Sequence, residues 1–195
     1  MLRELGATVK VIAANPDGKN INKACGAVSP ERLQEAVLKH KAHLGIAHDG
    51  DADRAVFVCE KGRMIDGDHI MAALALDLKS RKALARHAIV GTVMSNFGLE
   101  LAMAKAGVKL IRTPVGDRYI LERMVADGLN FGGEQSGHII QLDLARTGDG
   151  LLTALQMGAL IARSGETLSR LGVRVDLHAV TSTIFTSSFS ATCRW

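Results

Sequence analysis

The sequence has few aromatic residues, few prolines and no long apolar run. Of its 195 residues, 4% are aromatic and 3 are proline. No stretch of eighteen apolar residues occurs, and Met1 is followed by Arg3 and Glu4 rather than by the apolar segment of an export signal. We therefore expect a cytoplasmic protein that neither crosses nor binds a membrane.

Cysteine is equally scarce. The chain has an odd number of cysteines, Cys25, Cys59 and Cys193, and they have no CxxC spacing. Disulfide-bonded secreted domains show an even, dense cysteine pattern, so these residues are interpreted as reduced thiols.

The charge balance is mildly basic, with 24 Lys and Arg against 20 Asp and Glu and a net charge of +4. The basic residues are scattered, no basic run occurs and aromatics are few, so a nucleic-acid partner is not expected. An anionic small substrate fits the same excess. A content of 47% hydrophobic and 23% charged residues is typical of a globular chain with one large or two small domains.

Strand-like and helix-like patterns alternate along the chain. Strands are predicted over 7–13, 43–48, 55–59, 88–93, 108–112, 129–131 and 138–142, and helices over 31–40, 66–79, 97–106, 118–126 and 149–163. Ser29 and Asp66 are candidate N-caps for the first two helices. The alternation predicts an α/β fold with a parallel or mixed sheet flanked by helices. Residues 177–195 are rich in Ser and Thr and lack acids, and we expect them to be poorly ordered.

Asp49, Asp51 and Asp53 lie at alternate positions directly after a strand-like run, followed by Arg54. Three acids this close repel one another unless a hard cation lies between them, and all-oxygen ligands are those that Mg²⁺ and Ca²⁺ prefer. A phosphate oxygen or water would complete the shell, and Arg54 would hold such a phosphate. Residues 49–54, here called the metal loop, are therefore predicted to bind Mg²⁺.

The metal loop has three other interpretations. An EF-hand would need glycine where Arg54 stands, and residues 55–58 look like a strand rather than the rest of a calcium loop. A phosphatase with Asp49 as nucleophile and Asp51 as acid would have Thr or Val in place of Asp53. A solvated acidic turn without metal also remains open.

Residues 132–138, Gly-Gly-Glu-Gln-Ser-Gly-His, form a second candidate site, here called the sugar loop. Its glycines allow close approach of a ligand, and Glu134, Ser136 and His138 offer an acceptor, a hydroxyl and an imidazole. A carboxylate can accept two sugar hydroxyls, and a histidine can move a proton near neutral pH. The simpler alternative is a glycine-rich connection with polar surface side chains.

A third candidate is the turn at 112–118, which enters the helix predicted over 118–126. Its amides, with Gly116 at the turn, and the guanidinium of Arg118 would suit a phosphate. An ordinary strand-to-helix connection is the alternative.

Taken together, these motifs make the sequence similar to the α-D-phosphohexomutase superfamily, with Gln135 favouring its glucosamine branch. The motifs are DGDADR at 49–54, GGEQSGH at 132–138, VGDRY at 115–119, NIN and CG at 20–26, and TGDG at 147–150. The resemblance implies an enzyme that interconverts glucosamine 6-phosphate and glucosamine 1-phosphate on the way to amino-sugar cell-wall precursors. One Mg²⁺ and a glucosamine 1,6-bisphosphate intermediate belong to that reaction.

The resemblance also implies roles for individual residues. Asp49, Asp51 and Asp53 would bind the metal, Arg54 would lie at the phosphoryl-transfer centre, and Glu134 and Ser136 would hold the sugar with His138 beside them. Phosphoryl transfer depends mainly on positioning and charge neutralisation, which these residue types supply.

The resemblance further implies two α/β domains. Residues 1–66 would be the incomplete second domain of the superfamily, 67–172 the third domain, and 173–195 an atypical tail. The superfamily's phosphoserine belongs to a Ser-His-Asn-Pro-like loop of an upstream domain, and no such run occurs in this sequence. We therefore expect a mutase fragment that is inactive unless the missing domains act in trans.

Overall fold

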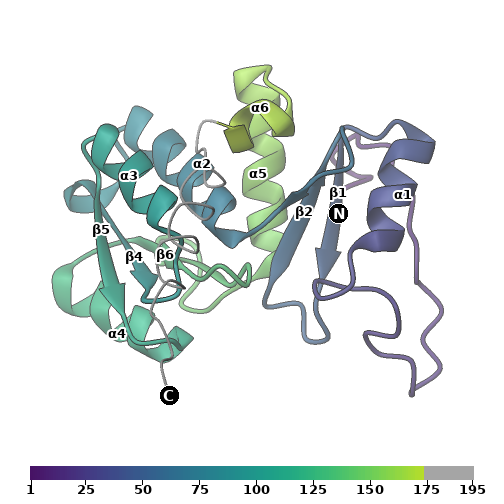
Figure 1. The fold of residues 1–195 in the computed structure, drawn as a ribbon, viewed down its shortest axis with the longest axis horizontal. Coiled ribbons are helices and arrows are strands. Elements are labelled where there is room, and N and C mark those ends of the chain that lie inside the picture. The colour runs from purple at the N-terminus through teal and green to yellow at the C-terminus, as the bar shows by residue number, and fades with distance from the viewer. Residues whose placement is uncertain (174–195) are drawn as a thin grey trace, which may run out of the picture.

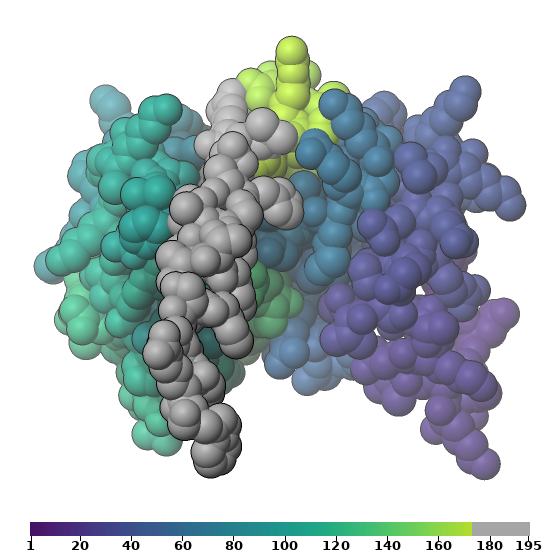
Figure 2. Space-filling view, viewed as in Figure 1, coloured from purple at the N-terminus to yellow at the C-terminus, as the bar shows by residue number. Residues whose placement is uncertain are grey.

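The computed structural model describes residues 1–173, which form two sheets with helices between and around them (Figure 1). In chain order the elements are α1 (Glu31–His40), β1 (Leu44–His48), β2 (Ala55–Cys59), β3 (Met64–Ile65), α2 (Gly67–Ser80), the short 3-10 helix η1 (Ala85–His87), β4 (Ala88–Thr92), α3 (Phe97–Lys105), β5 (Lys109–Thr113), α4 (Asp117–Asp127), β6 (Phe131–Gly133), β7 (Ile139–Gln141), α5 (Gly150–Ser164) and α6 (Leu168–Val173). This arrangement confirms the predicted α/β class. The N-terminal residues, in purple, and the residues from about 90 to 130, in teal, lie on opposite sides of the molecule (Figure 2).

The first sheet is antiparallel, in the order β1-β2-β3. β1 and β2 pair from Leu44↔Cys59 to His48↔Ala55, so the metal loop is the connection of a hairpin. Helix α1 lies so close to β1 that a Cβ on Gly45 would come within 2.6 Å of Val37. Every residue of β2 is buried, because helix α5 packs on the same sheet. The hairpin is thus held on both faces.

The second sheet has the order β5-β4-β6-β7. β5, β4 and β6 run parallel to one another, and β7 at the edge is antiparallel to β6. Helix α4 covers one face, where Ile120 and Met124 pack with Val90. Helices α2 and α3 cover the other. The main apolar cluster contains Phe57 of the first sheet and Phe131 of the second, so α2 and α5 join the two sheets through one core (Figure 1).

Three local predictions were wrong, one of them at Gly132 and Gly133, which belong to β6 rather than to a loop. Residues 7–13 form no strand, because β1, an edge strand of the first sheet, pairs only with β2 and not with them. Ser29 does not cap α1: Pro30 occupies the N-cap position, and the Ser29 hydroxyl donates to Glu31 at 2.8 Å. The prediction for 177–195 lies outside the described residues. None of the helices described within 1–173 combines the length and apolarity needed to cross a bilayer.

Candidate functional site

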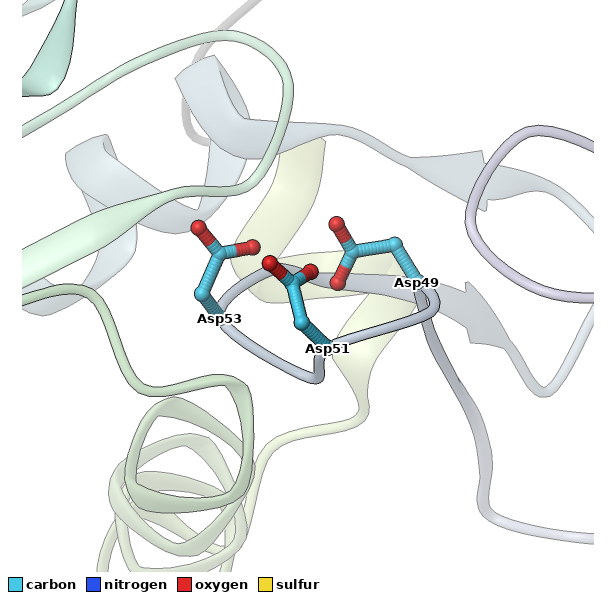
Figure 3. Close-up of side chains that lie close together, drawn as sticks. All are labelled: Asp49, Asp51 and Asp53. Atoms are coloured by element: carbon cyan, nitrogen blue, oxygen red, sulfur yellow. The ribbon is translucent and has the colours of Figure 1, made fainter.

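The three aspartates of the metal loop face a common point. One carboxylate oxygen from each of Asp49, Asp51 and Asp53 lies within 4.8 Å of the other two. Figure 3 shows the carboxylates turned to the same side of the loop. Asp51 is exposed, whereas Asp49 and Asp53 are partly buried. The hairpin therefore gathers the acids as the metal-site prediction requires.

The negative charge of this cluster is only partly compensated. The pKa of Asp53 is raised, mainly by burial. A hydrogen bond with Asp49 and the negative charge of Asp49 raise it further. Arg54 Nε lies 3.5 Å from Asp49 Oδ2 and 3.7 Å from Asp53 Oδ1. Asp53 Oδ1 is buried, and among residues 1–173 it has no hydrogen-bond partner. A buried carboxylate oxygen without a donor, among three acids and one arginine, fits a hard divalent cation.

Contacts to the main chain within residues 48–54 set the shape of the metal loop. Asp49 Oδ1 accepts a hydrogen bond from the Arg54 amide at 3.2 Å, and the Asp49 carbonyl accepts one from Ala52 at 3.3 Å. Ala52 has the left-handed φ of 62°. His48 Nδ1 lies 3.1 Å from the Arg54 carbonyl. Asp49 therefore shapes the loop as well as presenting an oxygen to its centre.

The sugar loop joins β6 to β7 in a tight turn. The Glu134 amide donates to the His138 carbonyl at 2.9 Å, and the Gly137 amide donates to the Glu134 carbonyl at 3.0 Å. Gly137 has a φ of 93°, which favours glycine. Glu134 Oε1 accepts a hydrogen bond from the Gly116 amide at 3.1 Å. The carboxylate predicted to hold a sugar is thereby anchored to the turn before α4.

The two loops meet through their main chains and through one side chain. Arg54 and His138 form an isolated antiparallel bridge, and the Ala55 amide donates to the Gly137 carbonyl at 3.1 Å. His138 Nε2 lies 3.5 Å from Asp53 Oδ2. The His138 side chain is 3% exposed, and neither of its ring nitrogens has a hydrogen-bond partner among the residues described. The structure therefore places His138 beside the metal loop.

The remaining predicted residues are less closely joined to this centre. Ser136 is exposed at the tip of the sugar loop. Arg118 lies on α4, where its Nε donates to Glu122 at 2.7 Å and its amide donates to Asp117 at 2.7 Å. The Arg118 side chain is 81% exposed. Its predicted role in phosphate binding thus requires it to leave Glu122, and it stays a prediction.

Residues at the start of α2 also shape the sugar loop, and the sequence analysis did not identify them as part of the site. The Gly67 amide donates to the Gln135 carbonyl at 2.9 Å, and Gln135 Nε2 lies 3.4 Å from Asp66 Oδ2. A Cβ on Gly67 would lie 2.0 Å from the Glu134 carbonyl oxygen. The available signal was a glycine in the first turn of a helix, where alanine is ordinarily favoured.

Two surface concavities in the described part of the chain lie away from the loops. A cavity of about 330 Å³ is lined by α2, α5 and α6 residues including Asp77 and Arg163, and one of about 290 Å³ is lined by residues including Glu60 and Thr167. Neither is lined by the metal loop or the sugar loop.

Comparison with known proteins agrees with the geometry. The sequence profile described as "Phosphoglucomutase/phosphomannomutase, alpha/beta/alpha domain III" matches residues 66–175. The chain belongs to the phosphoglucomutase/phosphomannomutase family. Phosphoglucosamine mutase of Myxococcus xanthus is 56% identical over 171 residues, covering 88% of this chain and 37% of the relative. That of Heliobacterium modesticaldum is 51% identical over 176 residues, covering 90% of the chain and 38% of the relative. The chain thus spans less than half the length of these family members.

Solved structures share the fold. A phosphoglucomutase/phosphomannomutase family protein from Burkholderia thailandensis is 28% identical, with a TM-score of 0.65 over 74% of this chain and 32% of that one. N-acetylphosphoglucosamine mutase of Aspergillus fumigatus, in complex with glucose 1,6-bisphosphate, matches with a TM-score of 0.61 over 80% of this chain and 37% of that one. At 23% identity the second likeness supports the fold alone.

Proposed function

We propose that this chain carries the metal-binding and sugar-binding parts of a phosphoglucosamine mutase. That enzyme interconverts glucosamine 6-phosphate and glucosamine 1-phosphate through a 1,6-bisphosphate and uses one Mg²⁺. The observation that carries the proposal is the contact between the two loops, with His138 Nε2 3.5 Å from Asp53 Oδ2. A site for a phosphosugar needs both a phosphate-binding and a hydroxyl-binding part, and this contact joins the two candidates.

Each residue has a proposed role that follows from its chemistry. Asp49, Asp51 and Asp53 would hold Mg²⁺, which when bound neutralises phosphate charge. Arg54, whose side chain is 44% exposed, offers its guanidinium to a phosphate. Glu134 is anchored through Oε1 by the Gly116 amide and can accept sugar hydroxyls. The imidazole of His138 has no hydrogen-bond partner among the described residues and is the group suited to hold or move a proton.

The serine that carries the phosphoryl group is proposed to lie outside these residues. The sequence contains no Ser-His-Asn-Pro-like run. We therefore propose that the chain alone binds Mg²⁺ and a hexosamine phosphate without turnover, and that the phosphoserine domain would act in trans. Binding without turnover distinguishes this proposal from an aspartate-nucleophile phosphatase, which would release inorganic phosphate.

The test is conversion of glucosamine 6-phosphate by the purified chain with Mg²⁺ and glucosamine 1,6-bisphosphate. The assay is run for the chain alone and with a separately produced phosphoserine domain, with Asp51→Asn as the loss variant. Asp127→Asn on α4 is the matched control. We expect turnover only when both parts are present and Asp51 is intact. Phosphate release by the chain alone, abolished by Asp49→Asn, would support the phosphatase instead.

A further inference from the structure

We propose that Gly148 and Gly150 are positioning residues that hold the metal loop against the sugar loop. Gly148 lies in the connection from β7 to α5, and Gly150 is the first residue of α5. Each glycine touches one of the two loops at a point where no side chain fits. The inference rests on the proposed function in one respect, because its first test measures metal binding.

Gly150 contacts the main chain of the metal loop. Its amide donates to the Ala52 carbonyl at 2.9 Å. A Cβ on Gly150 would lie 2.4 Å from the Arg54 carbonyl oxygen and 2.6 Å from His48 Nδ1. These two atoms are themselves 3.1 Å apart, so the methyl group would enter the contact that holds the end of the loop. Because the nearer atom belongs to the backbone, the loop itself would have to move.

Gly148 contacts the side chain through which the two loops meet. A Cβ on Gly148 would lie 2.3 Å from Nε2 and 2.4 Å from Cδ2 of His138. The same Nε2 is the atom 3.5 Å from Asp53 Oδ2. The His138 side chain is 3% exposed and so has little room to turn away. A methyl group at Gly148 would therefore push His138 and disturb its contact with Asp53.

Backbone conformation does not account for either glycine. Neither residue is among those with positive φ. Gly150 begins α5, where helix propensity alone would favour alanine over glycine. Gly158 lies in the same helix with nothing within 4 Å of its Cβ position, which makes it a matched control. The lack of room for a Cβ, rather than backbone conformation or helix propensity, thus explains glycine at positions 148 and 150.

The first experiment titrates the full 195-residue chain with Mn²⁺, used as a probe for the divalent site, and compares Gly150→Ala with Gly158→Ala. Circular dichroism and thermal unfolding confirm that each variant is folded. We expect Gly150→Ala to weaken Mn²⁺ binding by about tenfold or more, the range for groups that orient metal ligands. Gly158→Ala should bind like wild type. Equal affinity in a folded Gly150→Ala variant would overturn its positioning role.

The second experiment uses a double-mutant cycle. Gly148→Ala should weaken Mn²⁺ binding in the wild-type chain but have no further effect in a His138→Ala chain, because the ring it would strike is gone. Gly150→Ala should still weaken binding in a His48→Ala chain, because it strikes the Arg54 carbonyl. An equal effect of Gly148→Ala in both backgrounds would overturn the assignment.

Failure of the proposed function is distinguishable from failure of this inference. If the folded wild-type chain does not bind Mn²⁺, the proposed metal site is wrong. The positioning role is then tested by hydrogen exchange of the Ala55 amide, which donates to the Gly137 carbonyl at 3.1 Å. We expect Gly148→Ala to speed this exchange and Gly158→Ala to leave it unchanged. Unchanged exchange in Gly148→Ala would overturn the inference.

Discussion

The imidazole of His138 lies 3.5 Å from the carboxylate of Asp53, across the junction of two loops that belong to different sheets. The main chain enforces this contact, since Arg54 and His138 form a bridge and the Ala55 amide donates to the Gly137 carbonyl. The aspartates and the sugar loop therefore cannot separate without breaking backbone hydrogen bonds.

Asp51→Asn is expected to weaken Mg²⁺ binding without destabilising the metal-free protein. Asp51 is exposed and belongs to a cluster of three acids, so removing its charge relieves repulsion. Because residues that only orient ligands can cost about 10–100-fold in metal affinity, loss of a ligand should cost at least that much. Calorimetry measures the affinity, and thermal unfolding with chelator present measures the stability. Unchanged affinity would remove Asp51 from the metal site.

Glu134→Gln and Glu134→Ala should differ in stability but agree in sugar-phosphate binding. Glutamine keeps an oxygen for the Gly116 amide, whereas alanine leaves that amide without its partner, a loss of about 1 kcal/mol. Both variants lose the carboxylate that is proposed to accept sugar hydroxyls. Urea unfolding measures the first effect, and calorimetry with glucosamine 6-phosphate measures the second. Wild-type affinity in Glu134→Gln would show that the charge does not hold the sugar.

The stability of the chain should depend on pH through Asp68. Asp68 is fully buried in α2, and burial is the main reason that its pKa is raised from 3.8 to about 6. The folded state then holds the proton more tightly than the unfolded state, so stability falls as pH rises from about 4 to about 6. The ionised group at neutral pH costs about 3 kcal/mol relative to the protonated one.

Asp68→Asn tests this directly, because asparagine retains an oxygen for the Asn96 amide, which donates to Asp68 Oδ2 at 2.8 Å. Urea midpoints of both proteins are compared from pH 4 to pH 7. The difference between them should grow in favour of Asp68→Asn as pH rises from about 4 to about 6, and then level off. A difference that is constant with pH would contradict the raised pKa.

Arg112→Lys should destabilise the second sheet. Arg112 Nη1 donates to the carbonyls of Thr92 at 3.0 Å and Ser95 at 2.8 Å, and Nη2 donates to Glu100 at 3.0 Å. Lysine cannot reproduce this forked set of hydrogen bonds from a guanidinium. We therefore expect a loss of about 1–3 kcal/mol in unfolding free energy.

The control for Arg112 is Arg123→Lys on α4. Arg123 makes one ion pair with Asp127, and such exposed pairs contribute up to about 1 kcal/mol. Chemical denaturation of both variants provides the comparison. Equal effects would show that the fork at Arg112 does not hold the loop after β4.

Much of the fold could be predicted where local signals and tertiary packing agree. The helix over 31–40 is confirmed, and Asp66 caps α2 by accepting from the His69 amide at 3.2 Å. The strand over 7–13 could not be judged from its pattern, because a strand also needs a neighbour to pair with. The glycine-rich pattern predicts a loop at Gly132 and Gly133, but both belong to β6, where a Cβ on Gly132 would meet the Val90 carbonyl at 2.9 Å.

The residue types of the candidate site could be predicted from the sequence, but the contacts between those residues could not. Alternate acids after a strand predicted a cation site, and the structure gathers Asp49, Asp51 and Asp53. The position of His138 beside Asp53 depends on how two sheets pack on α2 and α5, which no local pattern encodes. The same is true of the Glu134 carboxylate and the Gly116 amide.

The most direct test of the central claim, that the metal loop and the sugar loop form one phosphosugar site, is the coupling between their ligands. Calorimetry measures binding of glucosamine 1,6-bisphosphate to the chain with and without Mg²⁺, and of Mg²⁺ with and without the bisphosphate. We predict that each tightens the other by the same factor. The coupling should disappear in Asp51→Asn. Two ligands that bind a folded chain independently, or with the same coupling in Asp51→Asn, would contradict the account.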